Sequence, residues 1–291
     1  MKSLLPIATL VAFALPLAAQ TSSEPKVSKE AFTWWNPTPA NLLRELSTDR
    51  PDKTECPFTV DAGHIQIELD AAVYSRDHDT SDGADSVEST WTFAATNLKV
   101  GLTNNSDVQF VFEPLVITKS DDHLVQPAQH ERSTAFSDVT VRYKRNFWGN
   151  EGGPSTLAIM PFVKLPIHGH GIGSDAAEGG VILPYSHDLP NGWGLGVQTE
   201  LDVNKNSSGH GYHAAYVNSI TAGHPITDKL EGYAELFSEH SAERGARWVG
   251  TADFGLTYSP TSDLQLDIGV NIGISPAATD VEFFTGLSRR F

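Results

Sequence analysis

The chain has 291 residues, of which 36 are acidic and 20 basic, and its formal net charge is −16. This acidic surplus disfavours nucleic-acid binding, which needs an excess of Lys and Arg to face the phosphates, so we expect no nucleic-acid partner. The single cysteine, Cys56, cannot form an intramolecular disulfide, so we expect a fold that is held together without covalent cross-links.

The beginning of the chain has the pattern of a secretory signal peptide. Lys2 precedes an apolar run over residues 4–17, and the small residues Ala18 and Ala19 follow it. The apolar run is shorter than the ~20 residues that a membrane-spanning helix needs, which disfavours the alternative of a permanent anchor. We therefore predict that residues 1–20 are a signal peptide.

Residues 21–60 show no alternating pattern, and we interpret them as an N-terminal periplasmic extension or plug. From His64 onward, apolar and polar residues alternate in one segment after another. In residues 65–70, the odd positions are Ile, Ile and Leu and the even positions are Gln, Glu and Asp. This period of two is typical of strands with one apolar face. It predicts strands at residues 64–76, 88–103, 107–117, 137–148, 156–165, 178–187, 193–204, 211–225, 229–239, 246–258, 263–274 and 281–291.

The alternation changes phase within the second of these segments, which predicts a β-bulge near Ala95 or Thr96. The connections are short at 104–107, 227–228 and 259–262. Longer polar connections at 77–87, 118–136, 166–177, 205–210, 240–245 and 275–280 alternate with them. Together with an even number of strands, this pattern predicts an all-β fold. Residues 61–291 are expected to form a closed antiparallel transmembrane β-barrel of about 12 strands in the bacterial outer membrane, with both termini periplasmic.

The aromatic residues of the apolar face fall into two groups at opposite strand ends, as expected for a lipid-facing wall. One group is Phe147, Tyr185, Trp193, Tyr258 and Phe291, and the other is Trp91, Tyr212, Trp248 and Phe283. A soluble β-sandwich is the alternative, and it would place its aromatic residues in the middles of the strands.

The charged face must line the interior of such a barrel, because a Lys or Arg that faces lipid at the midplane costs ~2–4 kcal/mol. The predicted lumen-lining residues are Glu68, Asp70, Glu113, Arg142, Lys144, Lys164, Glu200, Asp202, Glu231, Glu235, Arg247, Asp253, Asp267 and Arg290. Their acidic excess predicts a pore that prefers cations or neutral solutes. Alternatively, these charges pair across the lumen and fill it, since a barrel of about 12 strands lies between packed and open sizes.

Several motifs resemble the outer-membrane β-barrel family that is named after the phenol meta-cleavage pathway, of the MetA-pathway of phenol degradation type. The first is Leu-Ser-Thr-Asp-Arg-Pro-Asp-Lys-Thr-Glu at 46–55, and further matches lie at 161–166, 178–184, 192–197 and 263–269. The motif residues carried over are Thr48, Asp49, Arg50, Pro51, Asp52, Thr54 and Glu55. The chain departs from the family pattern at Cys56, where the family tends to have Ser, and at Arg289, where it has an aromatic residue.

The resemblance implies an outer-membrane transporter, here a channel for passive passage of a small, aromatic or hydrophobic, solute. It also implies an assembly signal at Phe283, Leu287 and Phe291 that the barrel-assembly machinery reads. The expected partners are therefore outer-membrane lipid, this machinery and a small-molecule solute, with no cofactor. The charged 48–55 stretch is interpreted as a plug or gate at the periplasmic mouth, with a solvated linker as the alternative.

A second hypothesis is a structural or surface-binding barrel with a filled lumen and with external loops that bind metal or a partner. The weak metal candidates are His168, His170, His210 and His213, whose imidazoles lie in or beside neighbouring loops. The third hypothesis is an outer-membrane hydrolase. The sequence lacks the G-x-S-x-G and H-E-x-x-H motifs, and we predict no catalytic residue and no enzyme activity.

Overall fold

The computed structural model describes residues 28–80, 85–112, 115–124, 129–135, 138–166 and 176–291. The predicted signal peptide lies outside the described residues. The described part is almost entirely β-structure, with two short 3₁₀ turns, η1 (Ala40–Leu42) and η3 (Pro190–Gly192). No helix in these residues is long and apolar enough to span a membrane.

The strands follow the predicted order closely. They are β1 (Ile65–Asp79), β2 (Ser86–Phe93), β3 (Ala95–Thr103), β4 (Ser106–Phe112), β5 (Leu115–Asp122), β6 (Gln129–Ala135), β7 (Val139–Trp148), β8 (Ser155–Leu165), β9 (Glu178–Asp188), β10 (Gly194–Lys205), β11 (Tyr212–Pro225), β12 (Leu230–Ser241), β13 (Val249–Thr261), β14 (Leu264–Gly273) and β15 (Val281–Arg290).

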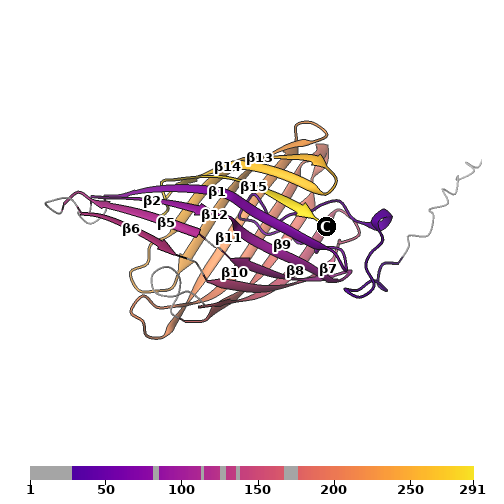
Figure 1. Ribbon diagram of the computed structural model, residues 1–291, viewed down its shortest axis with the longest axis horizontal. Helices are drawn as coiled ribbons and strands as arrows, with labels where there is room; N and C mark the ends of the chain where they lie inside the picture. The colour runs from indigo at the N-terminus through magenta and orange to yellow at the C-terminus, as the bar shows by residue number, and fades with distance from the viewer. Residues whose placement is uncertain (1–27, 81–84, 113–114, 125–128, 136–137, 167–175) are drawn as a thin grey trace, which may run out of the picture.

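These 15 strands form a wall of 12, because three strands of the wall each consist of two consecutive segments: β2 with β3, β4 with β5, and β6 with β7. Each of the 12 strands of the wall pairs antiparallel with the next one along the chain. β1 also pairs with β15, which closes the barrel. At this seam, Phe291 N donates to Ile65 O at 2.8 Å. The predicted closed antiparallel barrel is confirmed (Figure 1).

The predicted irregularity in the second wall strand is present at Ala94, one residue before the expected position. Ala94 has φ +57° and separates β2 from β3. β1 pairs with β3 through Ile65–Asp70 and with β2 through Val73–Asp79. The irregular backbone at Ala94 therefore divides the second strand of the wall into two segments, β2 and β3.

One predicted connection is wrong in part. Residues 118–136 were expected to be a long polar loop, but β5 continues to Asp122 and β6 begins at Gln129. Polar residues occupy both faces of these strand ends, so the apolar alternation that marks a strand is missing there. The strands β1, β2, β5 and β6 project past the rest of the wall at the end far from the C-terminus (Figure 1). We call this the loop end, and the end with Ile65 and Phe291 the terminal end.

The apolar face of the wall points outward and the polar face points into the lumen. On β14, Leu266 and Ile268 are exposed, whereas the alternating Asp267 and Asn271 are buried. The same holds on β10, where Leu201 and Val203 are exposed and Gln198 is buried. The interior of the molecule is therefore polar and its surface is apolar, which is the reverse of a soluble domain.

Both predicted aromatic groups are at their expected strand ends, and all members except Tyr185 are exposed. Phe147, Trp193, Tyr258 and Phe291 mark the terminal end. Tyr185 is half-buried, with its hydroxyl 3.4 Å from His187 Nδ1. The exposed band between the two aromatic groups consists of aliphatic and aromatic side chains of the outer face.

A charge on this outer face should destabilise the barrel according to its depth. We expect Ile268→Arg, in the middle of β14, to lower the free energy of unfolding by ~2–4 kcal/mol, because the guanidinium would face hydrocarbon. Ile274→Arg, just past the strand end, should cost only ~0–1 kcal/mol. Urea titrations of protein folded into lipid vesicles measure both values. Equal costs at the two positions would contradict a lipid-facing wall.

Candidate functional site

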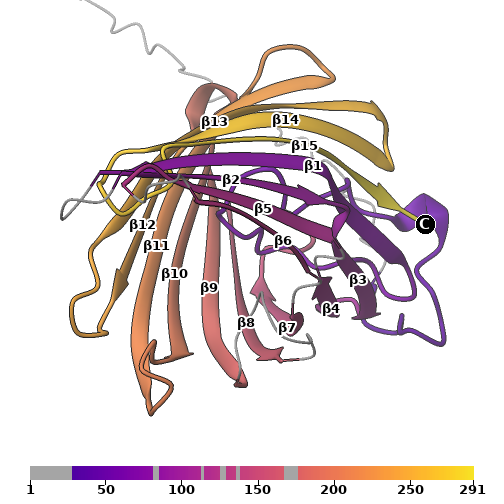
Figure 2. The ribbon, with the colours of Figure 1, turned by 60° about the vertical axis from the view of Figure 1, so that its left-hand side comes forward.

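The chain enters the barrel at the terminal end before it forms β1. We call residues 44–61 the lumen segment, and it contacts inward-facing side chains of strands from β1 to β15. Figure 2 shows this stretch as the indigo loop enclosed by the wall. The segment has no regular secondary structure, so side chains of the wall provide most of its hydrogen bonds.

Asp49 is the centre of the contacts on the side of β1, β3 and β7. Its carboxylate accepts from Lys99 Nζ at 2.7 Å and from Lys144 Nζ at 2.6 Å. Lys99 also binds Glu68 at 2.9 Å, and Lys144 donates to Cys56 O at 2.6 Å. All these charged side chains are nearly or fully buried. Each charge thus has an opposite partner, which a buried charge requires.

The two lysines determine the charge state of Asp49. Burial alone would raise the pKa of this carboxyl, but the ammonium groups of Lys144 and Lys99 outweigh it and hold the pKa well below its usual range. Asp49 is therefore ionised throughout the physiological pH range. The thiol of Cys56 lies 2.8 Å from Ser47 Oγ, and burial raises its pKa, so it remains protonated.

Arg50 joins the lumen segment to the opposite arc of the wall. Its guanidinium donates to both carboxylate oxygens of Asp267, with distances of 2.6 and 3.2 Å, and also contacts Asp70. It lies over the ring of Phe284 at 6.0 Å. Gly286 makes this approach possible, because a Cβ there would lie 2.4 Å from Arg50 Nη2. The glycine is thus part of the site.

Residues 53–55, which we call the tip of the segment, reach the strands β10 to β13. Thr54 Oγ1 lies 2.7 Å from Ser219 Oγ and 2.5 Å from Glu235 Oε1. Lys53 donates its backbone N–H to Glu235 at 2.8 Å, and its ammonium binds Asp253 at 3.2 Å.

Glu55 is held by two further strands of the wall. It pairs with Arg142 at 2.6 Å, and its backbone N–H donates to Gln198 Oε1 at 2.7 Å. Arg142 is on β7 and Gln198 is on β10, so the tip contacts the wall on more than one side.

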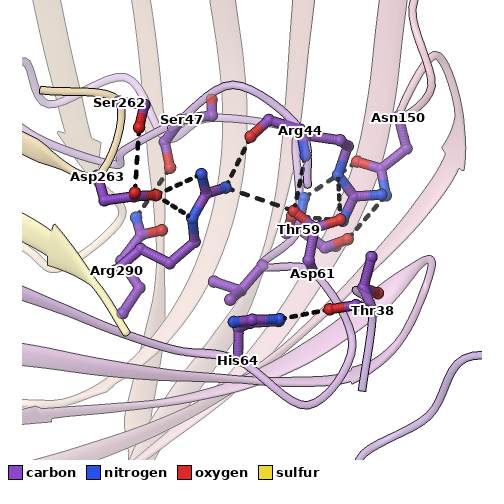
Figure 3. Close-up of polar contacts among 12 residues, drawn as sticks. Thr38, Arg44, Ser47, Thr59, Asp61, His64, Asn150, Ser262, Asp263 and Arg290 are labelled. Atoms are coloured by element: carbon purple, nitrogen blue, oxygen red, sulfur yellow. Dashed lines mark hydrogen bonds and ion pairs between the residues drawn. The ribbon is translucent and has the colours of Figure 1, made fainter. Parts of the chain in front are cut away.

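A second polar network anchors the base of the lumen segment at the terminal end (Figure 3). Arg290 donates to Arg44 O at 2.7 Å and to Asp263 at 2.6 and 2.9 Å. Arg44 in turn lies 3.4 Å from Asp61 and donates to Thr59 O at 2.9 Å. The last strand and the entry of the N-terminal segment are therefore locked together.

Most predicted lumen-lining residues point inward. Glu68, Asp70, Arg142, Lys144, Glu235, Asp253, Asp267 and Arg290 contact the lumen segment directly. Glu200 accepts from Gln198 at 2.7 Å, Lys164 binds Glu178 at 3.1 Å, and Glu231 and Asp202 approach glycines of neighbouring strands. Glu113 lies outside the described residues.

The predicted position of Arg247 on a strand is wrong. It was expected on an inward face of a strand at residues 246–258, but β13 begins only at Val249. Arg247 is exposed in the connection before it. The adjacent Trp248 has the outward phase of β13 and is exposed, and its indole donates to Ser238 of β12 at 2.9 Å.

Three residues of the site were not among the predicted lumen-lining residues. They are Lys99, the partner of Asp49, Gln198, and Gln66, whose side-chain amide donates to Ser47 O at 2.8 Å. Lys99 lies between the outward Leu98 and Val100, so the alternation itself places it on the lumen side. Only the change of phase in this strand obscured that signal. Gln66 and Gln198 are uncharged, and a search for charges could not find them.

The predicted metal candidates do not form a site in the described part of the chain. His213 Nδ1 lies 2.9 Å from Asn206 Oδ1, and His210 accepts from Asn206 only through its backbone carbonyl. Among the described residues, no three His, Cys, Asp or Glu side chains are grouped so as to hold a metal ion. His168 and His170 lie outside the described residues.

Fold and site together define an outer-membrane β-barrel with an acidic, polar lumen that its own N-terminal segment occupies. The family model described as "Putative MetA-pathway of phenol degradation" matches residues 48–291. The chain belongs to this family. The match begins at Thr48 and thus includes the part of the lumen segment that carries the ion pairs.

Solved structures with a similar fold are also outer-membrane proteins. The COG4313 outer membrane channel from Pseudomonas putida F1 has a TM-score of 0.59 and 12% identity, covering 84% of this chain and 100% of that chain. The NanC porin has a TM-score of 0.50 and 12% identity, covering 76% and 98%. No curated protein sequence matches the chain significantly. At these identities the likeness concerns the fold alone.

Removal of the Asp49 charge should leave two buried ammonium groups without their shared partner. We expect Asp49→Asn to lower the free energy of unfolding by ~3–5 kcal/mol. The control is Asp263→Asn, whose carboxylate pairs with Arg290 but is 45% exposed, and it should cost ~0–1 kcal/mol. Urea unfolding in detergent, followed by tryptophan fluorescence, compares the two. A small loss for Asp49→Asn would show that the cluster relaxes or takes up water.

The acid side chain of Asp52 should give a pH-dependent effect of the opposite sign. Burial and the negative charge of Glu235 raise the pKa of Asp52 well above its usual range. A carboxyl whose pKa is raised by folding costs stability as the pH rises above its unfolded value of ~4. We therefore expect Asp52→Asn to be more stable than the original protein at pH 7 and equal to it at pH 3. Unfolding titrations at both pH values test this, and a gain that is independent of pH would contradict it.

Proposed function

We propose that this protein is an outer-membrane channel for the passive passage of small solutes, and that the lumen segment is its plug. The observation that carries the proposal is the mismatch between a wide polar barrel and the short, irregular segment that occupies it through side-chain contacts. A lumen that served only as a core would be filled by the side chains of the wall, as in barrels of eight strands. Here a separate piece of chain occupies it, and such a piece is able to move.

The solute class follows from the charge of the lumen and from the family. Acidic side chains outnumber basic ones among the inward-facing residues, which favours neutral or cationic solutes over anions. The family description refers to phenol degradation, and we take small aromatic or otherwise hydrophobic molecules as the first candidates. The P. putida structure is described as a channel, which agrees with passage rather than catalysis, and we propose no enzyme activity.

We place the terminal end in the periplasm, because the connections there are short and those at the loop end are longer. In this orientation the plug closes the periplasmic half of the lumen. The exposed Phe291 and the alternating Phe283 and Leu287 then form the segment that the barrel-assembly machinery reads. Arg289 lies 5.0 Å from the ring of Phe291 and keeps its head at the interface.

A structural or surface-binding barrel is the second candidate. The buried cluster of Asp49, Lys99 and Lys144 favours it, because these residues fill their part of the lumen permanently. The two functions differ in whether any path past the plug exists.

Ion conductance of the refolded protein in a planar bilayer tests the channel. We expect discrete current steps with a preference for cations. Glu200→Gln combined with Asp202→Asn should lower the cation-to-anion permeability ratio, because it removes two lumen carboxylates that do not hold the plug. The reversal potential in a potassium chloride gradient measures this ratio. A barrel that shows the heat-dependent gel shift of a folded wall and yet stays silent would favour the second candidate.

A further inference from the structure

The contacts of the lumen segment differ in kind around the barrel. On the side of β3 and β7, the buried Lys99 and Lys144 hold Asp49 through ion pairs. On the side of β11 and β12, Thr54 and the backbone N–H of Lys53 form hydrogen bonds with Ser219 and Glu235. The nearest ion pair joins Asp253 on β13 to the ammonium of Lys53, whose side chain is 30% exposed. Breaking a hydrogen bond costs little net stability, because water takes the place of the lost partner. Removing one partner of a buried ion pair costs several times more, because the other charge stays buried without a partner. The tip is therefore easier to release on the β11 and β12 side than the segment is on the β3 and β7 side.

A cavity of about 290 Å³ lies directly beneath the tip, between the lumen segment and the wall of β9 to β14. Thr257 and Gln265 line it near the terminal end, and Asp52, Thr221 and Tyr233 line it near the tip. The contact of Thr54 with Ser219 and Glu235 lies above it, on the side of the loop end. That contact thus separates the cavity from the rest of the lumen.

The wall beside the cavity is built to stay open. Gly194, Gly196 and Gly223 all line it, in place of larger inward side chains. A Cβ at Gly196 would lie 3.2 Å from Thr54 Cγ2 and 2.6 Å from Thr221 Cγ2. A larger residue there would press on the tip and fill the cavity.

The lining also presents groups that suit a small neutral or cationic solute. Asp52 and Glu231 supply carboxyl groups. The hydroxyl of Tyr233 is buried without a hydrogen-bond partner among the described residues, and a buried polar atom of this kind needs one. Arg50 also reaches the lining, but Asp70 and Asp267 already bind its guanidinium.

We infer that solutes pass the plug on the side of β11 and β12. The tip moves off Ser219 and Glu235, the lumen opens into the cavity, and the solute contacts Tyr233 and Glu231 before it leaves at the terminal end. The ion-paired part of the segment around Asp49 stays in place. This route rests on the proposed channel function and specifies where the channel opens.

A reversible cross-link between tip and wall tests the route. Thr54→Cys with Ser219→Cys, in a Cys56→Ser background, replaces two hydroxyl oxygens that are 2.7 Å apart, so oxidation should join them. We expect oxidation to abolish the potassium chloride conductance and dithiothreitol to restore it. Thr54→Ala should have the opposite effect and raise the open fraction about tenfold, since it removes the hydrogen bonds of the Thr54 hydroxyl to Ser219 and Glu235.

The controls are the single variants Thr54→Cys and Ser219→Cys in the same Cys56→Ser background. Neither can form the disulfide, so oxidation should leave the conductance of each unchanged. If the tip-to-wall cross-link forms and the current persists, the route is wrong while the channel function stands. If no variant conducts, including Thr54→Ala, although the barrel is folded, both the route and the channel function fail.

A second measurement does not depend on cross-linking. Thr257→Cys in the Cys56→Ser background should react with a cationic methanethiosulfonate added from the terminal side, and the current should fall, because this residue lines the cavity. Ser288→Cys is the matched control, since Ser288 is fully buried on β15, away from the cavity. Current loss at Ser288→Cys alone would place the path on the other side of the plug.

Discussion

The structure depends on one constraint: in a hydrocarbon layer, every backbone N–H and C=O must find its partner within the protein. The pairing of β1 with β15 satisfies this constraint, because it leaves no strand of the wall with an unpaired edge. Closure then divides the side chains of each strand between two environments. The outer face becomes apolar, and the polar face is enclosed in a lumen where its charges must find partners.

The lumen segment supplies many of those partners. Asp49 pairs with Lys99 and Lys144 of the wall, and Arg50 pairs with Asp70 and Asp267. The charges of wall and segment are therefore complementary. This explains how a piece of chain with almost no regular secondary structure has a defined position: its place is fixed by the charges around it, and by glycines such as Gly286 that let it approach the wall.

The same arrangement shows how the proposed passage of a small solute is compatible with a lumen that the segment occupies. Ion pairs between buried groups hold one side of the segment, while hydrogen bonds of the tip close a small cavity on the other side. In the proposed route, the tip opens on the side of its hydrogen bonds, and the ion pairs around Asp49 keep the segment in the barrel. Complete removal of the segment would instead leave Lys99 and Lys144 without Asp49, which is far more costly.

The alternation of apolar and polar residues was sufficient to predict the wall. A period of two fixes which side chains share a face, so the strands, the barrel, the outward aromatic groups and most inward charges followed from it. The signal failed where both faces are polar, as in β5 and β6 beyond the wall. It also did not mark the start of β13, so Arg247 was assigned to a strand. Which charges pair with one another could not be predicted in this way, because the partners are far apart in the chain. Lys144 lies 95 residues from Asp49 and Asp267 lies 217 residues from Arg50, and their pairing depends on closure and stagger of the barrel, which alternation along one strand does not encode.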